Sequence, residues 1–199
     1  MKEPLVLASA SEIRSALLRN SGIAVETRPV RVDEAAIKAT MLSGGAAPRD
    51  IAAELAENKA MRAATRDPER LVLGCDQVLV LEGRLFDKPG DLAEARAQLR
   101  KLRGKAHELF AAAVMVEDGR PVWRHVGRAG LTMRSFSDAF LENYLEEHGE
   151  EVLCCVGCYR LEGAGAQLFT RVEGDYFSVL GLPLLEVLGF LRSKGVCRT

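Results

Sequence analysis

The sequence lacks the signatures of several large enzyme classes. It has no G-x-x-x-x-G-K-S/T phosphate-binding loop, because Gly104-Lys105 has neither the upstream glycine nor a following hydroxyl residue. Gly163-Ala164-Gly165 lacks the third glycine of a dinucleotide-binding fingerprint and follows no clean strand-to-helix unit. No G-x-S-x-G surrounds a serine. P-loop, Rossmann and serine-hydrolase chemistry are therefore not indicated.

Metal-binding histidines and cysteines are also scarce. The three histidines, His107, His125 and His148, are at no ligand spacing, so a histidine-based zinc site is not expected. Five cysteines are an odd number, and reduced thiols in the cytoplasm are the expectation. The run 154–158 contains a C-x-x-C, but no second pair and no histidine follows at zinc-finger spacing. We predict a buried strand end there rather than a structural zinc site.

Long apolar runs and an excess of one charge are missing as well. No run approaches the ~20 residues that span a bilayer, and the formal net charge is −1, so neither a membrane nor nucleic acid is an expected partner. Ala8-Ser9-Ala10 resembles a signal-peptidase site. The apolar stretch before it is far shorter than the usual ~7–15 residues, so a signal peptide is rejected.

What is present is an ordinary globular composition, with 48% hydrophobic and 28% charged residues in 199. Strand and helix patterns alternate, and several hairpins occur, so we predict an α/β fold with a mixed sheet in one domain over 1–199. Predicted strands cover 4–8, 25–32, 71–73, 78–81, 84–86, 109–116, 122–124, 128–136, 152–156 and 168–172. Predicted helices begin at 12 and 137 and after 183, and cover 48–64 and 92–101, while 35–48 reads as a loop or a weakly helical connector.

The opening stretch, residues 4–18, predicts a strand, a serine-bearing turn and a helix capped by Ser11. The free N–H groups at the start of such a helix suit an anion. Ser9, Ser11 and Arg14 add hydroxyl groups and a guanidinium, which are typical donors to phosphate oxygens. An ordinary capped helix with a surface arginine is the simpler alternative.

Acids and lysines follow several strand-like runs. Glu34, Asp76 and Asp87 are the acids, Lys88 adjoins Asp87, and Lys59 lies on a predicted helix. Ligands collect where the strands of α/β sheets end, so these side chains are candidates to converge. Two or three carboxylates can hold Mg²⁺, lysines can bind phosphate oxygens, and a carboxylate can deprotonate water. The alternative is that each is a solvated surface charge.

Read together, these pieces resemble the Maf family of nucleotide pyrophosphatases. Its L-A-S-x-S-P-x-R opening is matched at 7–14, although Glu12 replaces the usual proline. Seven further motifs of the family are matched in order: D-E at 33–34, L-A-x-x-K-A at 55–60, the strand-end acid motif at 74–78, K-P at 88–89, L-x-G-x-x-H at 102–107, G-D-Y at 174–176 and G-L-P at 181–183. The order and spacing of these motifs cover nearly the whole chain.

The resemblance implies an elongated mixed α/β fold with a cleft between two lobes, and hydrolysis of a nucleoside triphosphate to the monophosphate and pyrophosphate with Mg²⁺ or Mn²⁺. By position, Asp76 would accept the proton and Glu34 would bind metal or orient water, with both acids as metal ligands. Lys59 and Lys88 would neutralise phosphate charge. Ser9, Ser11 and Arg14 would hold the phosphates. A homodimer is implied as well.

The base preference implied by the resemblance depends on three positions. Gln77 and Glu162 are like the branch acting on 7-methyl-GTP, and Ile13 offers the base only apolar contact. The branch acting on dTTP and UTP usually has different residues at all three positions. Hydrolysis of dTTP or UTP is therefore the first alternative rather than the expectation. The second is a nucleotide-binding regulator of septum formation without strong catalysis.

Overall fold

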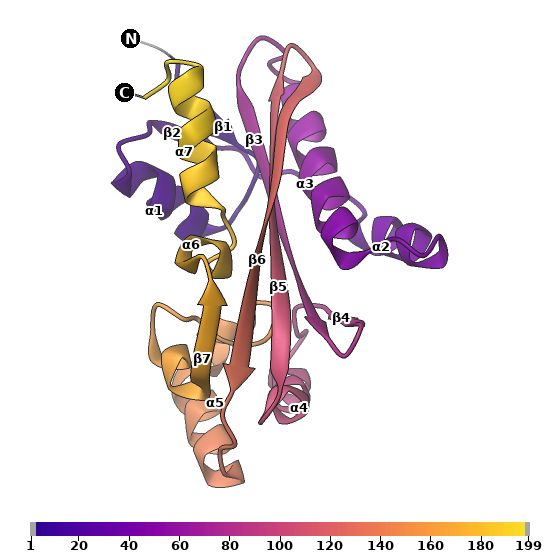
Figure 1. The fold of residues 1–199 in the computed structure, drawn as a ribbon, viewed down its shortest axis with the longest axis vertical. Coiled ribbons are helices and arrows are strands. Elements are labelled where there is room, and N and C mark those ends of the chain that lie inside the picture. Colours follow the sequence, from indigo (N-terminus) through magenta and orange to yellow (C-terminus); the bar gives the residue numbers. More distant parts are fainter. Residues whose placement is uncertain (1–2, 198–199) are drawn as a thin grey trace. The chain divides into compact units, whose positions relative to one another are not determined.

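The computed structural model describes residues 3–197 as an α/β protein with one mixed sheet (Figure 1). The hydrogen-bonded strand order is β2-β1-β3-β5-β6-β7, with β4 paired to β3. The described residues divide into two compact units. The first comprises residues up to Gln77, Phe110–Gly127 and residues from Gly181 onwards, and the second comprises Val78–Leu109 and Arg128–Leu180.

The first unit is built on short parallel strands. Strand β1 (Leu5–Leu7) pairs in parallel with β2 (Val25–Thr27) and with the start of β3 (Val72–Leu81). Its three residues are fully buried, as expected for an apolar run covered on both faces. The helices of this unit are α1 (Glu12–Asn20), α2 (Glu34–Ser43), α3 (Pro48–Ala64) and α7 (Leu184–Ser193).

Helix α3 packs unusually closely on β3. An added Cβ at Gly74 would lie 2.1 Å from the carbonyl oxygen of Ala56 and 2.7 Å from the Cβ of Ala60. The missing side chain at Gly74 therefore allows the helix backbone to approach the strand, and the small Ala60 has the same effect from the helix. This approach fixes the position of Lys59 relative to the strand.

The second unit is built on antiparallel pairs and one apolar core. It contains β4 (Arg84–Phe86), α4 (Leu92–Leu102), α5 (Asp138–Val152), a 3₁₀ helix (Ala164–Leu168), β7 (Phe169–Gly174) and α6 (Tyr176–Val179). Strands β5 (Ala106–Glu117) and β6 (Arg120–Met133) contribute to both units. Side chains of α4, α5 and the strands, including Leu99, Leu131 and Leu141, form the core.

Several predicted boundaries are confirmed. Ser11, Asp91 and Ser137 cap α1, α4 and α5, and the predicted helix 48–64 is α3. Glu82-Gly83 and Asp118-Gly119 form the hairpin turns, with positive φ at all four residues.

Other predictions are wrong. Residues 74–77 do not end a strand, because β3 continues to Leu81, and the two strands predicted at 122–124 and 128–136 are one strand, β6. Strand β2 ends at Thr27 rather than at residue 32, whereas for 35–48 the helical alternative is confirmed in part by α2. Residues 152–156 are not extended, since α5 runs to Val152 and turns follow. Among residues 3–197, none of the helices has the length and apolar character that crossing a bilayer requires.

Candidate functional site

The turn between β1 and α1 has the predicted donors. The Ser9 hydroxyl oxygen accepts from the Ser11 backbone N–H at 3.2 Å and from Arg14 Nη1 at 3.2 Å. Ser11 Oγ accepts from the Arg14 backbone N–H at 3.5 Å, as an N-cap does. Ser9 is only 8% exposed, so its hydroxyl is held by these bonds and keeps its own proton to donate.

The Arg14 side chain connects three distant parts of the first unit. Its Nε donates to the Gly181 carbonyl at 2.8 Å, and Nη1 also donates to the Cys75 carbonyl at 3.1 Å. Gly181 has φ +91°, and a Cβ there would lie 3.1 Å from Arg14 Nη2. The glycine of the G-L-P motif therefore supplies both the left-handed backbone and the space that this contact needs. The Nη2 group is the part of the guanidinium that none of these bonds uses.

Next to Cys75, Asp76 forms a charged group with Lys59 and Glu34. Lys59 Nζ lies 2.5 Å from Asp76 Oδ1 and 2.7 Å from Glu34 Oε1. The Asp76 side chain is 8% exposed and that of Lys59 14%, whereas Glu34 is 44% exposed. The structure thus brings together three of the four predicted catalytic residues, all from the first unit.

The charges of this group stabilise one another. Burial lowers the pKa of Lys59, but the neighbouring carboxylates of Asp76 and Glu34 outweigh it, and the pKa is raised overall. The lysine is therefore an ammonium, with two of its three N–H groups donated to carboxylates. Lys38, one helical turn after Glu34 on α2, lies 4.0 Å from the second Glu34 oxygen.

Local structure explains how these residues are placed. Asp33 caps α2, because its carboxylate accepts from the Ala36 backbone N–H at 3.0 Å, and Glu34 consequently occupies the first turn. Asp76 is in the middle of β3 rather than at a strand end. The close packing of α3 at Gly74 brings Lys59 to it.

Glu34 and Asp76 fit a divalent cation of the Mg²⁺ type. An oxygen of each contacts the same nitrogen atom, so the two carboxylates lie close together. Mg²⁺ is typically held by one or two carboxylates and takes its other ligands from water and substrate phosphates. Within residues 3–197 no group of three or more His, Cys, Asp or Glu side chains is arranged for a metal, so an all-protein cage is not indicated.

The remaining predicted residues are spread over both units. Ile13 is half-buried in the first turn of α1, and Gln77 follows Asp76 on β3. Lys88 is exposed in the segment after β4, next to Asp87. Glu162 lies in a turn before the 3₁₀ helix, where its Oε1 accepts from Arg160 Nε at 3.1 Å.

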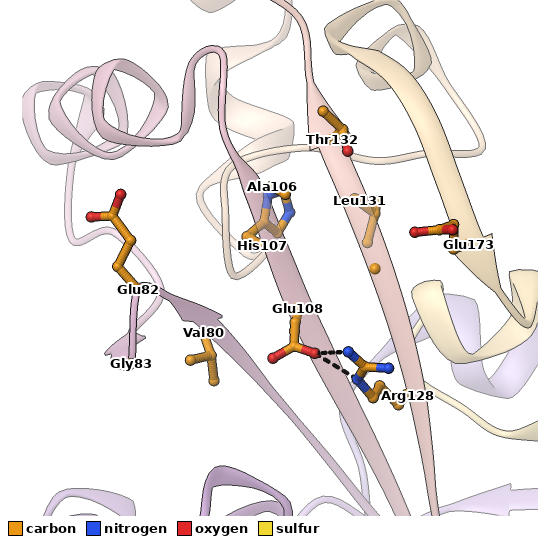
Figure 2. A pocket seen from close by; sticks show the side chains of 11 residues that line it. Val80, Glu82, Gly83, Ala106, His107, Glu108, Arg128, Leu131, Thr132 and Glu173 are labelled. Atoms are coloured by element: carbon orange, nitrogen blue, oxygen red, sulfur yellow. Dashed lines mark hydrogen bonds and ion pairs between the residues drawn. The ribbon is translucent and has the colours of Figure 1, made fainter.

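The second unit has a pocket of about 490 Å³, and none of the predicted site residues lines it (Figure 2). Three glutamates line it, each with a basic partner: Glu82 pairs with Lys105, Glu108 with Arg128 and Glu173 with Arg171. Figure 2 shows the Glu108–Arg128 pair between β5 and β6. The carboxylates of this pocket are thus all engaged in ion pairs.

Sequence reasoning missed two contributors. The contact of the Gly181 carbonyl with Arg14 was not predicted, and neither was the contact of the Arg160 side chain with Glu162. The G-L-P motif marks Gly181, but a backbone carbonyl has no signature of its own. Arg160, two residues before Glu162, is the kind of basic neighbour that spacing alone can suggest.

The cysteine prediction is wrong. Cys154 is exposed and Cys155 half-buried, while Cys158 is buried, and all five cysteines are free thiols. The three cysteines of the run 154–158 follow the end of α5 rather than a strand, so this run is not a buried strand end.

Comparison with known proteins identifies the family. The model of the family described as Maf-like protein matches residues 4–194. The nucleoside triphosphate pyrophosphatase 1 of Jannaschia sp. (strain CCS1) is 52% identical over 96% of this chain and 97% of its own length. The 7-methyl-GTP pyrophosphatase of Mesorhizobium japonicum is 48% identical over 98% of both chains. A solved dITP/XTP pyrophosphatase of Mycobacterium abscessus is similar at 18% identity, with a TM-score of 0.38, over 66% of this chain and 74% of that one. By its sequence match, the chain belongs to the family of Maf-like proteins.

Proposed function

We propose that this chain hydrolyses a nucleoside 5'-triphosphate to the monophosphate and pyrophosphate. The relatives at about half identity over nearly the whole chain are named for this activity. The observation that carries the proposal is the group of Asp76, Lys59 and Glu34 next to the carbonyl that Arg14 binds. Together with Arg14 and the serine hydroxyls of the β1–α1 turn, this group offers a base, cations and hydroxyl donors, which is what phosphoanhydride hydrolysis needs.

In the proposed reaction, Asp76 accepts the proton of a water molecule whose oxygen attacks the α-phosphorus. The bond from that phosphorus to the oxygen bridging to the β-phosphorus breaks, and pyrophosphate leaves. Glu34 orients the water. Lys59 offers its third N–H to a phosphate oxygen, where negative charge increases in the transition state.

The phosphates are proposed to bind at the β1–α1 turn. Ser9 and Ser11 offer hydroxyl groups, α1 offers the N–H groups of its first turn, and Arg14 offers Nη2. Lys88, exposed after β4, is proposed to add a further cation. Glu34 and Asp76 would hold Mg²⁺ or Mn²⁺, which supplies Lewis-acid stabilisation of phosphate charge when bound.

For the base, we propose 7-methylguanine. The Glu162 carboxylate can accept hydrogen bonds from guanine N1–H and N2–H and favours a positively charged methylated ring. Arg160 donates to one oxygen of this carboxylate at 3.1 Å, which orients it and leaves further lone pairs as acceptors. Gln77 adds an amide, and Ile13 an apolar contact. We also propose that the chain acts in the cytoplasm as a homodimer, and its five free thiols are consistent with a reducing compartment.

The test is pyrophosphate release from 7-methyl-GTP, GTP, dTTP, UTP and CTP with Mg²⁺ or Mn²⁺. We expect turnover with a preference for 7-methyl-GTP. Asp76→Asn should lower kcat by about 10²–10⁴, because it removes the base and keeps the shape. Asp118→Asn, the same change in the exposed β5–β6 turn, is the matched control and should keep wild-type rates.

The outcomes are distinct. Preferred turnover of dTTP or UTP would contradict the base assignment alone. Wild-type rates in Asp76→Asn would remove Asp76 from the mechanism. Tight nucleotide binding without turnover of any substrate would overturn the proposal in favour of a regulatory protein.

A further inference from the structure

Two adjacent thiols lie side by side in the second unit, in the turns just after α5. Cys154 Sγ and Cys155 Sγ are 3.7 Å apart. Cys154 is exposed and its thiol donates to the Glu151 carbonyl at 3.1 Å, one of the carbonyls that the end of a helix leaves open. Cys155 is half-buried beside it.

The turn that follows holds this pair in place. Cys158 is buried, its thiol donates to Gln98 Oε1 at 3.4 Å, and its carbonyl accepts from the Tyr144 hydroxyl at 3.3 Å. Gly157 has φ +83°, and a Cβ there would lie 2.6 Å from Leu79. The backbone after the pair is therefore fixed against the core, and Cys158 is directed towards Gln98.

The distance between the two sulfurs suits chelation of one atom. Two thiolate ligands at about 2.3 Å from one atom lie between about 3.3 Å apart at a pyramidal centre and about 3.8 Å apart at a tetrahedral one, so a small side-chain adjustment suffices. A closed metal site needs further ligands, and no group of three or more His, Cys, Asp or Glu placed for a metal exists in residues 3–197. The ligand that fits is one that needs two sulfurs and brings its own third substituent.

We propose that Cys154 and Cys155 form a two-thiol binding site for monosubstituted trivalent arsenicals and similar thiophilic groups. With an arsenic(III) oxide of the form R–As=O, two arsenic–sulfur bonds form and the arsenic–oxygen double bond breaks. The two thiol protons leave with the oxygen as water. Arsenic stays trivalent, so no oxidant or reductant takes part.

The protonation of Cys155 distinguishes this chemistry from disulfide exchange. Burial, followed by the neighbouring Cys154, raises the pKa of the Cys155 thiol to about 12. A thiol that is protonated at neutral pH attacks disulfides slowly, because the thiolate is the nucleophile. Condensation with an arsenical oxide consumes the two thiol protons as water and is compatible with a neutral Cys155 thiol.

The test is intact mass spectrometry of the folded, reduced chain with one equivalent of phenylarsine oxide in excess glutathione. We expect a single phenylarsenic adduct, although the chain has five cysteines. The adduct should withstand the monothiol and be removed by dithiothreitol, because only a second chelating dithiol competes with the pair.

Variants locate the site. Cys154→Ser and Cys155→Ser should each reduce the adduct at least ten-fold, and Cys197→Ser, which is the matched control, should keep it. Circular dichroism checks that each variant is folded. If Cys155→Ser does not fold, the adduct yield of Cys154→Ser alone tests the proposal, because Cys154 is exposed and its substitution should leave the fold intact. An adduct that survives in Cys154→Ser but is lost in Cys158→Ser would overturn the proposal, as would a wild-type adduct that glutathione removes.

Discussion

Asp33 and Glu34 show how adjacent residues of one motif differ in what they contact. The Asp33 carboxylate accepts from a backbone N–H and starts α2, while Glu34 contacts Lys59. The acid of the G-D-Y motif behaves like Asp33: Asp175 accepts from the Ser178 backbone N–H at 2.8 Å and from its hydroxyl at 2.9 Å. Two acids of the family motifs therefore cap helix N-termini, whereas Glu34 and Asp76 contact the Lys59 ammonium instead.

His107 leads to a prediction about pH. It is 2% exposed, its Nε2 lies 2.8 Å from the Tyr159 hydroxyl, and burial lowers its pKa to about 4. In the unfolded chain the histidine has a pKa of about 6.5, so as the pH falls the unfolded chain binds the proton before the folded one does. The contribution of the neutral histidine to the free energy of unfolding is therefore fully present above about pH 6.5 and is lost as the pH falls towards 4. Between pH 7.5 and 5 this residue should cost about 2 kcal/mol of the free energy of unfolding.

Urea unfolding at the two pH values measures this effect. In His107→Gln the loss between pH 7.5 and 5 should be smaller by that amount, because the amide does not titrate. His125→Gln is the matched control and should follow the wild type. An equal loss in wild type and His107→Gln would show that His107 does not cause it.

At the scale of elements, the sequence predicted what is local and missed what depends on distant neighbours. Helix caps such as Ser11 and Ser137 were found because the capping hydroxyl bonds within three residues. Residues 74–77 were predicted to interrupt the strand, since glycine and aspartate are rare within strands. Packing of α3 on Gly74 and the ion pair of Asp76 with Lys59 keep them in β3. The site was predicted as residue types from the family resemblance, whereas its bonds between distant segments came only from the structure.

The contact between α3 and β3 can be tested at Gly74. A methyl group in Gly74→Ala would collide with the Ala56 carbonyl, so the helix must shift. Overpacking of this kind costs about 1–3 kcal/mol, and we expect such a loss in urea unfolding together with reduced pyrophosphatase activity, because Lys59 moves with the helix. Gly44→Ala, at φ −82° with 3.5 Å to its nearest neighbour, should be close to neutral. Equal stabilities for the two variants would argue against close packing at Gly74.

At the scale of the whole molecule, the two units are not consecutive in the chain. The backbone passes from one to the other four times, at residues 77, 109, 127 and 180. The first unit is thus completed by segments from the middle and the end of the sequence, and neither unit is a contiguous fragment.

A fragment of residues 1–77 tests this organisation. It contains Arg14, Glu34, Lys59 and Asp76 but lacks Phe110–Gly127 and α7. We expect no cooperative thermal transition by circular dichroism, because β3 would lose β5, its hydrogen-bonded neighbour in the sheet, whereas the full chain should show one. A cooperative transition in the fragment would show that the first unit does not need its later segments.

The bond between Arg14 and the Gly181 carbonyl has a consequence for the ribosome. The two residues are 167 positions apart, so the arginine is translated early and its partner close to the end. Nascent domains generally fold as units once their parts have emerged. Until Gly181 has emerged, the Arg14 guanidinium therefore lacks this acceptor. A chain cut before Gly181 loses the bond for good, and the orientation of the Arg14 side chain is then held only by its contacts with Ser9 and Cys75.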